Sequence, residues 1–198
     1  MTTLTTFKKI KLGTGIKDAD GFRKALKKTD CTVGVWGNDI LGKPALTVAL
    51  QEMEVELVVV SVAELGFNGG ATRADIYKRA NELGLDLCPN EVGPQLRLQY
   101  KDQPKGEWLL IAMEPITASF GGPLVFCVER RDGGTQWLDA NLGRPDFSWF
   151  ADERWVFVRR KSFGSQTLGT MESDTLPLEL ESAIKIVKDA GYKIIKEI

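Results

Sequence analysis

Two acidic residues, Glu91 and Glu107, are the best candidates for catalytic residues in this sequence. Two carboxylates about 5–10 Å apart across a cleft are the minimum set for hydrolysing a glycosidic bond without histidine. Aromatic side chains that could stack on sugar rings are also present: Trp108, Trp137, Phe147, Trp149 and Trp155. Surface carboxylates are abundant in proteins, and tryptophans commonly fill a core. We therefore favour structural roles for these residues and keep a carboxylate-dependent hydrolase acting on glycans as an alternative function.

A row of polar side chains, Gln95, Arg97 and Gln99, is a second candidate site. These residues alternate with Leu96 and Leu98, and such alternation predicts a strand with one polar face. The planar guanidinium of arginine suits the recognition of carboxylate or phosphate groups. A strand face in contact with solvent would show the same alternation. We predict that the row is a binding surface, with a solvated strand face as the competing interpretation.

Basic and aromatic side chains form a third candidate site near residues 154–163. The basic members are Arg154, Arg159, Arg160 and Lys161, with Arg130 and Arg131 on an earlier turn and Trp155 and Phe163 beside them. Such a patch can bind single-stranded nucleic acid through phosphate contacts and stacking. Four acidic residues interrupt it: Asp132, Asp139, Asp152 and Glu153. Nucleic-acid binding is therefore an alternative that we do not favour, since 26 Lys and Arg also face 27 Asp and Glu in the chain.

Several catalytic chemistries are excluded by residues that the sequence lacks. It contains no histidine, which removes Ser–His and Cys–His pairs and histidine-based zinc sites. Three widely spaced cysteines, without a CxxC motif, support neither a metal site nor a disulfide framework. The glycine-rich residues 67–72 lack the spacing and the lysine of a phosphate-binding loop. We predict no metal and no cofactor, and we favour a protein without enzymatic activity.

The expected location is the cytoplasm, without a membrane partner. No apolar stretch approaches the roughly 20 residues that are needed to span a bilayer. The first residues, MTTLTTFKKIKL, lack the apolar region of a signal peptide. An odd number of widely spaced cysteines is also typical of reduced cytosolic thiols.

An α+β fold is predicted to position the candidate residues. Residues 95–100 and 108–113 are predicted to pair as one antiparallel hairpin, and residues 124–128 and 136–138 as a second around the turn at 130–134. A helix is predicted at about residues 72–84, with a capping-box-like start at Thr72 and Asp75 and a stop at Gly84. Further elements are a helix capped by Asp20, strands near residues 31–35, 55–62 and 155–158, and a helix-strand unit over 178–198.

Four segments are predicted along the chain, although the whole could also be one domain. They are an N-terminal α/β portion (1–62) that need not fold independently, a strand-rich α+β module (63–161), a connector (162–177) and a helix-strand tail (178–198). The first boundary is placed where an apolar strand ends and Gly66, Gly69 and Gly70 follow. The connector is recognised by its richness in Ser, Gly and Thr.

One block of the sequence has a distinctive residue pattern. Residues 64–116 read ELGFNGGATRADIYKRANELGLDLCPNEVGPQLRLQYKDQPKGEWLLIAMEPI, and the pattern continues more loosely through LVFCVERRDGGTQWLDA and RWVFVRRK to about residue 161. This block resembles a family of uncharacterised bacterial and phage-associated proteins. The resemblance implies a self-contained prokaryotic module that occurs beside varied partners. It implies no activity and no catalytic residue, and it covers about half of the chain.

The function that these observations favour is a non-catalytic interaction module of prokaryotic or phage origin that binds another protein. The reasons are the missing catalytic motifs, the missing cofactor loop and the balanced charge, which is −1 in total. Two docking places are predicted for the unidentified partner: the polar row at residues 95–99 and the edge of a final strand at residues 192–198.

Overall fold

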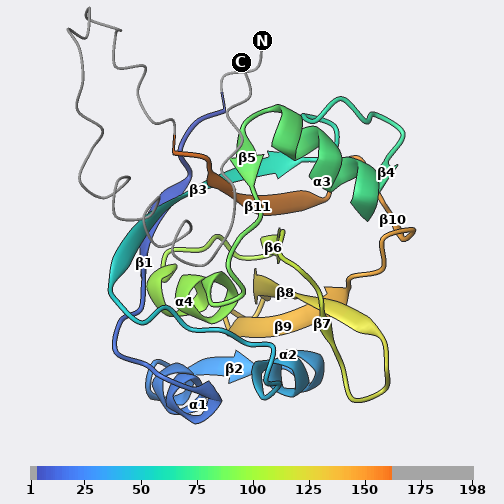
Figure 1. Ribbon diagram of the computed structural model, residues 1–198. Coiled ribbons are helices and arrows are strands. Elements are labelled where there is room, and N and C mark those ends of the chain that lie inside the picture. Colours follow the sequence, from blue (N-terminus) through green and yellow to red (C-terminus); the bar gives the residue numbers. More distant parts are fainter. Residues whose placement is uncertain (1–3, 162–198) are drawn as a thin grey trace, which may run out of the picture. The chain divides into compact units, whose positions relative to one another are not determined.

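The computed structural model describes residues 4–161, which form one large mixed sheet with four helices packed against it (Figure 1). The strands are β1 (Lys8–Leu12), β2 (Cys31–Val33), β3 (Met53–Ser61), β4 (Ala71–Thr72), β5 (Leu85–Asp86), β6 (Trp108–Ile111), β7 (Ile116–Thr117), β8 (Pro123–Arg130), β9 (Gln136–Leu142), β10 (Ser148–Trp149) and β11 (Arg154–Arg159). The helices are α1 (Ala19–Lys28), α2 (Val35–Leu41), α3 (Arg73–Glu82) and α4 (Val92–Gln99).

The main path of the nine-stranded sheet runs β1–β3–β11–β6–β8–β9–β2, with β5 paired to β11 and β7 paired to β8. β4 and β10 form a separate two-stranded sheet. Most neighbours are antiparallel, but β11 runs parallel to β6, and β2 runs parallel to β9. The predicted α+β class is confirmed, whereas the prediction of an antiparallel sheet is wrong, because the sheet is mixed. Parallel neighbours need a long crossover between them. Such pairing joins distant segments, so the alternation of polar and apolar residues within one strand does not reveal it.

One of the two predicted hairpins is present. β8 pairs antiparallel with β9 from Leu124 opposite Leu142 to Arg130 opposite Gln136, around the predicted turn. The other hairpin is wrong, because residues 92–99 form the helix α4 and β6 pairs with β8 and β11 instead. Pro94 is tolerated because it lies in the first turn of α4, where a backbone N–H has no partner within the helix.

The helix α4 is buried on several sides, which explains why its sequence imitates a strand. It packs against β1, β8, β9 and α1, and Leu96 and Arg97 are both fully buried. Gly93 lets it approach β8, since a Cβ there would lie 2.6 Å from the side chain of Phe126. A helix that is enclosed in this way has no continuous polar face, so the helical period is not visible in its hydrophobic pattern.

The predicted helix near residues 72–84 is confirmed as α3. Thr72 is its N-cap, and the hydroxyl of Thr72 accepts a hydrogen bond from the Asp75 N–H at 3.2 Å. Ile76 and Ala80 are buried on one face, and Gly84 follows the helix with a φ of 79°. Helix α1 is also present, but its N-cap is Asp18 and not Asp20, because the carboxylate of Asp18 accepts from the Gly21 N–H.

Strands from both sides of the expected boundary near residue 62 belong to the same sheet. β3 lies between β1 and β11 and pairs antiparallel with both. The buried side chains of the described residues also form a single apolar cluster, which includes Ile10, Leu57, Phe126 and Trp155. The N-terminal portion and the strand-rich module therefore share one sheet and one core.

Figure 1 shows α1 and α2 near β2, the last strand of the main path of the sheet, and α3 near β5 on the opposite side of the picture. Among residues 4–161, no helix combines the length and the apolar composition of a membrane span. The predicted connector (162–177), the predicted tail (178–198) and Phe163 lie outside the described residues.

Candidate functional site

A surface hollow of about 510 Å³ lies where the turn before β6 meets the turn before β11. It is lined by Pro104, Lys105, Gly106, Glu107, Trp108, Asp152, Glu153 and Arg154. β6 and β11 are parallel neighbours, with Leu110 opposite Trp155. Because parallel strands begin at the same edge of a sheet, the turn before β6 and the turn before β11 come together there. The sheet topology thus places Trp108 and Arg154, the first residues of the two strands, beside one hollow.

Glu107 is held from two sides at the wall of this hollow. Its Oε2 accepts a hydrogen bond from the Tyr100 hydroxyl at 2.8 Å, and its Oε1 pairs with Arg154 Nη1 at 2.7 Å. The side chain of Glu107 is only 11% exposed. Burial and, secondly, the hydrogen bond to Glu107 raise the pKa of the Tyr100 hydroxyl, so this hydroxyl stays a donor at neutral pH. Glu107, predicted as one acid of a catalytic pair, anchors the wall of the hollow.

Two further acids at the hollow, Asp152 and Glu153, have no such partners. Neither carboxylate forms an ion pair within residues 4–161. Burial, followed by the charge of Asp152, raises the pKa of Glu153. The lining contains three acidic and two basic side chains, and one of the basic ones, Arg154, is already paired with Glu107. The hollow therefore has an excess of negative charge.

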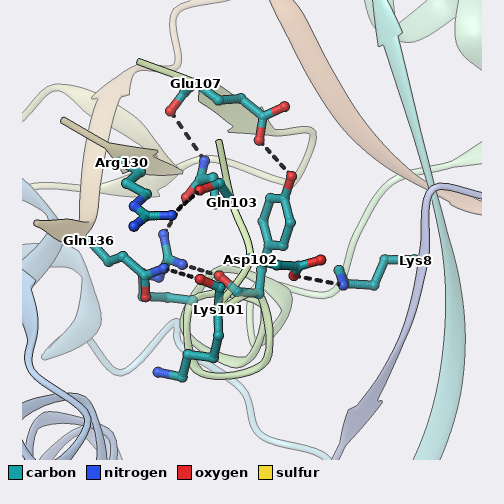
Figure 2. Close-up of polar contacts among 9 residues, drawn as sticks. Lys8, Lys101, Asp102, Gln103, Glu107, Arg130 and Gln136 are labelled. Atoms are coloured by element: carbon teal, nitrogen blue, oxygen red, sulfur yellow. Dashed lines mark hydrogen bonds and ion pairs between the residues drawn. The ribbon is translucent and has the colours of Figure 1, made fainter. Parts of the chain in front are cut away.

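A buried polar network fixes the turn that carries Glu107 (Figure 2). Arg97 is fully buried, and its guanidinium donates to the Gln103 side-chain oxygen, to the carbonyl of Tyr100 and to the carbonyl of Glu129. Gln103 in turn donates to the carbonyl of Glu107 at 3.2 Å. Burial lowers the pKa of Arg97, whose charge is compensated by oxygens of carbonyl groups. Arg97 therefore positions the turn and does not face a ligand, contrary to the predicted binding role.

The side chains of Glu91, Gln95 and Gln99 lie along one side of α4 at i, i+4 spacing. Glu91 accepts from the N–H groups of Gly13 and Ala49, both at 2.8 Å, and is 1% exposed. Gln95 Nε2 donates to Glu91 Oε1 at 2.9 Å, and Gln99 Nε2 donates to Gln95 Oε1 at 3.1 Å. These three residues form what we call the α4 polar ladder.

Gln99, at the end of the α4 polar ladder, closes part of the edge of the sheet. It accepts from the Lys11 N–H at 2.9 Å and donates to the Lys11 carbonyl at 2.8 Å, as a neighbouring strand would. The predicted strand face is thus an internal helix face. Glu91 and Glu107 are also not a catalytic pair, because the carboxylate of Glu91 is enclosed by backbone donors and that of Glu107 is bonded elsewhere.

The basic residues predicted to bind nucleic acid are dispersed among different partners. Arg154 pairs with Glu107. Arg159 Nε lies 3.3 Å from Glu56 Oε2, and Arg160 Nη2 lies 2.6 Å from Asp86 Oδ1. Arg154 and Arg159 begin and end β11, and five steps of about 3.3 Å separate them by about 16 Å. Lys161 is exposed beyond the strand. Arg154 therefore lies apart from Arg159, Arg160 and Lys161, which follow one another at the end of β11.

The three cysteines all lie within residues 4–161, and none of them lines the hollow. Residues 4–161 contain no group of three or more Cys, Asp or Glu side chains that could hold a metal ion. The three cysteines are buried and unpaired. Burial raises the pKa of the Cys127 thiol to about 12 and also raises that of Cys88, which opposes formation of a thiolate.

Sequence reasoning missed four residues of this site: Tyr100, Gln103, Asp152 and Glu153. Asp152 and Glu153 were recognised only as acids that weaken a basic patch. The sequence did show a turn before each of the two strands, one of which begins at Trp108 and the other at Arg154. Nothing local indicated that the two strands are parallel neighbours, so nothing brought the two turns together.

Comparison with known proteins adds no assignment to the site. No protein-family model matches the chain, and neither a curated protein nor a solved structure matches it. A function must therefore be argued from the charge, exposure and geometry of the residues around the hollow.

Proposed function

We propose that this chain is a non-catalytic interaction module that binds another protein through the surface around the hollow. The observation that carries the proposal is the exposure of Phe150, whose side chain is 76% exposed. Phe150 lies two residues before Asp152, which lines the hollow. Large exposed aromatic residues next to polar groups are typical of the residues that dominate protein-binding energy.

The turn that carries Phe150 is firmly attached to the sheet. The N–H of Val62 donates to the Glu153 carbonyl at 3.0 Å, and the N–H of Ala63 donates to the Ala151 carbonyl at 2.8 Å. The N–H of Glu153 donates to the Phe150 carbonyl at 3.2 Å and closes the turn. A rigid turn loses little conformational entropy on binding, which favours affinity.

Further aromatic side chains lie between the turn that carries Phe150 and the hollow. Phe147 contacts Trp149 with ring centroids 5.0 Å apart, and Trp149 lies 6.2 Å from Trp108 at the hollow. Trp149 is buried, whereas Phe147 is exposed. Aromatic residues close to charged groups are also common at the centre of a protein interface.

Affinity capture from the organism that encodes the chain tests this proposal when the two variants Phe150→Ser and Leu50→Ser are included. Leu50 is fully exposed and serves as the matched control. We expect one protein to be retained by the wild type and by Leu50→Ser, and its affinity to fall at least tenfold with Phe150→Ser. Retention by all three forms, or by none, would contradict the proposal.

A further inference from the structure

We infer that the hollow beside Glu107 takes an arginine side chain of the partner protein. This inference rests on the proposed protein-binding function and names the chemistry of one contact within it. The first support is charge. Asp152 and Glu153 lack ion-pair partners within the described residues, and Arg154 is occupied by Glu107. A cation entering the hollow would therefore meet two free carboxylates and one exposed lysine, Lys105.

The second support is shape, which favours a guanidinium over an ammonium group. Trp108, the first residue of β6, is among the residues that line the hollow. A guanidinium is planar, can stack on an aromatic ring and can donate two parallel hydrogen bonds to a carboxylate. An ammonium group offers the charge without this planar geometry. The volume of about 510 Å³ is ample for one side chain.

The third support is an arrangement of the same kind elsewhere in the chain. The guanidinium of Arg131 lies 3.7 Å from the centre of the Trp137 ring, and its Nη2 lies 2.7 Å from Glu129 Oε1. One arginine thus uses a tryptophan and a carboxylate together. The hollow is also lined by a tryptophan and by acidic residues, and we infer that the partner supplies the arginine that binds them.

A titration of the full chain with two blocked amino acids tests this inference. The probes are N-acetyl-arginine methylamide and N-acetyl-citrulline methylamide, which has nearly the same shape without the charge. Nuclear magnetic resonance would follow the amide signals of residues 105–108 and 152–154 and the indole N–H of Trp108. We expect saturable shifts at these signals, with a dissociation constant on the order of millimolar for the arginine probe and at least tenfold weaker binding of citrulline.

Two variants locate the binding on the two free acids. The double change Asp152→Asn with Glu153→Gln should weaken the arginine probe at least tenfold. Asp30→Asn removes an exposed charge at a position whose φ of 54° asparagine also adopts, and should leave binding unchanged. Equal responses to arginine and citrulline on the wild type, or shifts centred on other residues, would overturn the inference.

The test separates this inference from the proposed function. An absent arginine response together with Phe150-dependent capture of a protein would overturn the inference and leave the proposed function in place. A specific arginine response together with failed capture would support the inference for the hollow and contradict the proposed function.

Discussion

At the scale of single residues, the α4 polar ladder completes hydrogen bonding that no strand provides. Glu91 accepts from two backbone N–H groups of segments that lie outside regular structure, and Gln99 bonds both the N–H and the carbonyl of Lys11. Buried polar groups without partners are costly, so side chains of this kind are retained for structure. Glu91, which the sequence suggested as a catalytic residue, thus has a structural role in the protein.

The change Glu91→Gln tests this role. A carboxylate satisfies the N–H groups of Gly13 and Ala49 together, whereas an amide must turn its NH₂ group toward one of them. We expect the free energy of unfolding to fall by about 2–3 kcal/mol, as for loss of a hydrogen bond to a buried charged group. Urea denaturation measures it. Glu82→Gln, at an exposed ion pair, should change stability by less than about 0.5 kcal/mol, and an equally small effect for Glu91→Gln would refute the role.

At the scale of elements, α2 is tied to the turn between β7 and β8 by Asp39. The Asp39 carboxylate accepts from the hydroxyl and the N–H of Ser119, at 2.6 and 2.7 Å, and pairs with Lys43 at 3.1 Å. These contacts, with Ser119 first, lower the pKa of Asp39 from 3.8 to about 2. A carboxyl whose pKa is lowered in the folded state stabilises that state above its ordinary pKa and loses the effect as pH falls.

Thermal denaturation at a series of pH values from 6 to about 2 checks this link with the variant Asp39→Asn. The wild type should melt at a higher temperature than the variant above pH 4, and the difference should shrink between pH 4 and about 2 as Asp39 becomes protonated. Asp30→Asn, with no such contacts in the described residues, provides the control. A difference between wild type and Asp39→Asn that stays constant over this range would show that the contacts of Asp39 do not stabilise α2.

Elements with a visible period could be predicted from the sequence, and enclosed or non-local ones could not. The helix α3 has one polar face and a cap at Thr72, and the β8–β9 hairpin has local pairing around its turn. The helix α4 has buried residues on more than one side, so Leu96 and Leu98 imitated a strand. The hollow depends on the parallel contact between β6 and β11, and such pairing is not encoded in local spacing.

At the scale of the whole molecule, the described residues bring charge and aromatic surface to one place by sheet topology. Strands that are far apart in the sequence are neighbours in the sheet, because β3 and β6 flank β11. The turn that carries Phe150 and the acids is attached to the end of β3 and lies beside the turn that carries Glu107. The sheet therefore brings the turn that carries Phe150 close to the acidic hollow, which supports the proposed binding surface.

Site-specific photo-crosslinking in the native cell shows whether a protein partner binds at the hollow. A photoreactive residue would replace Lys105, which is exposed at the hollow, and in a second form would replace Leu50, which is exposed elsewhere. We expect position 105 to crosslink to one discrete protein, at a segment of that protein that contains arginine, and position 50 not to crosslink to it. A pattern of crosslinks that is the same from both positions, or the absence of any protein crosslink from position 105, would contradict it.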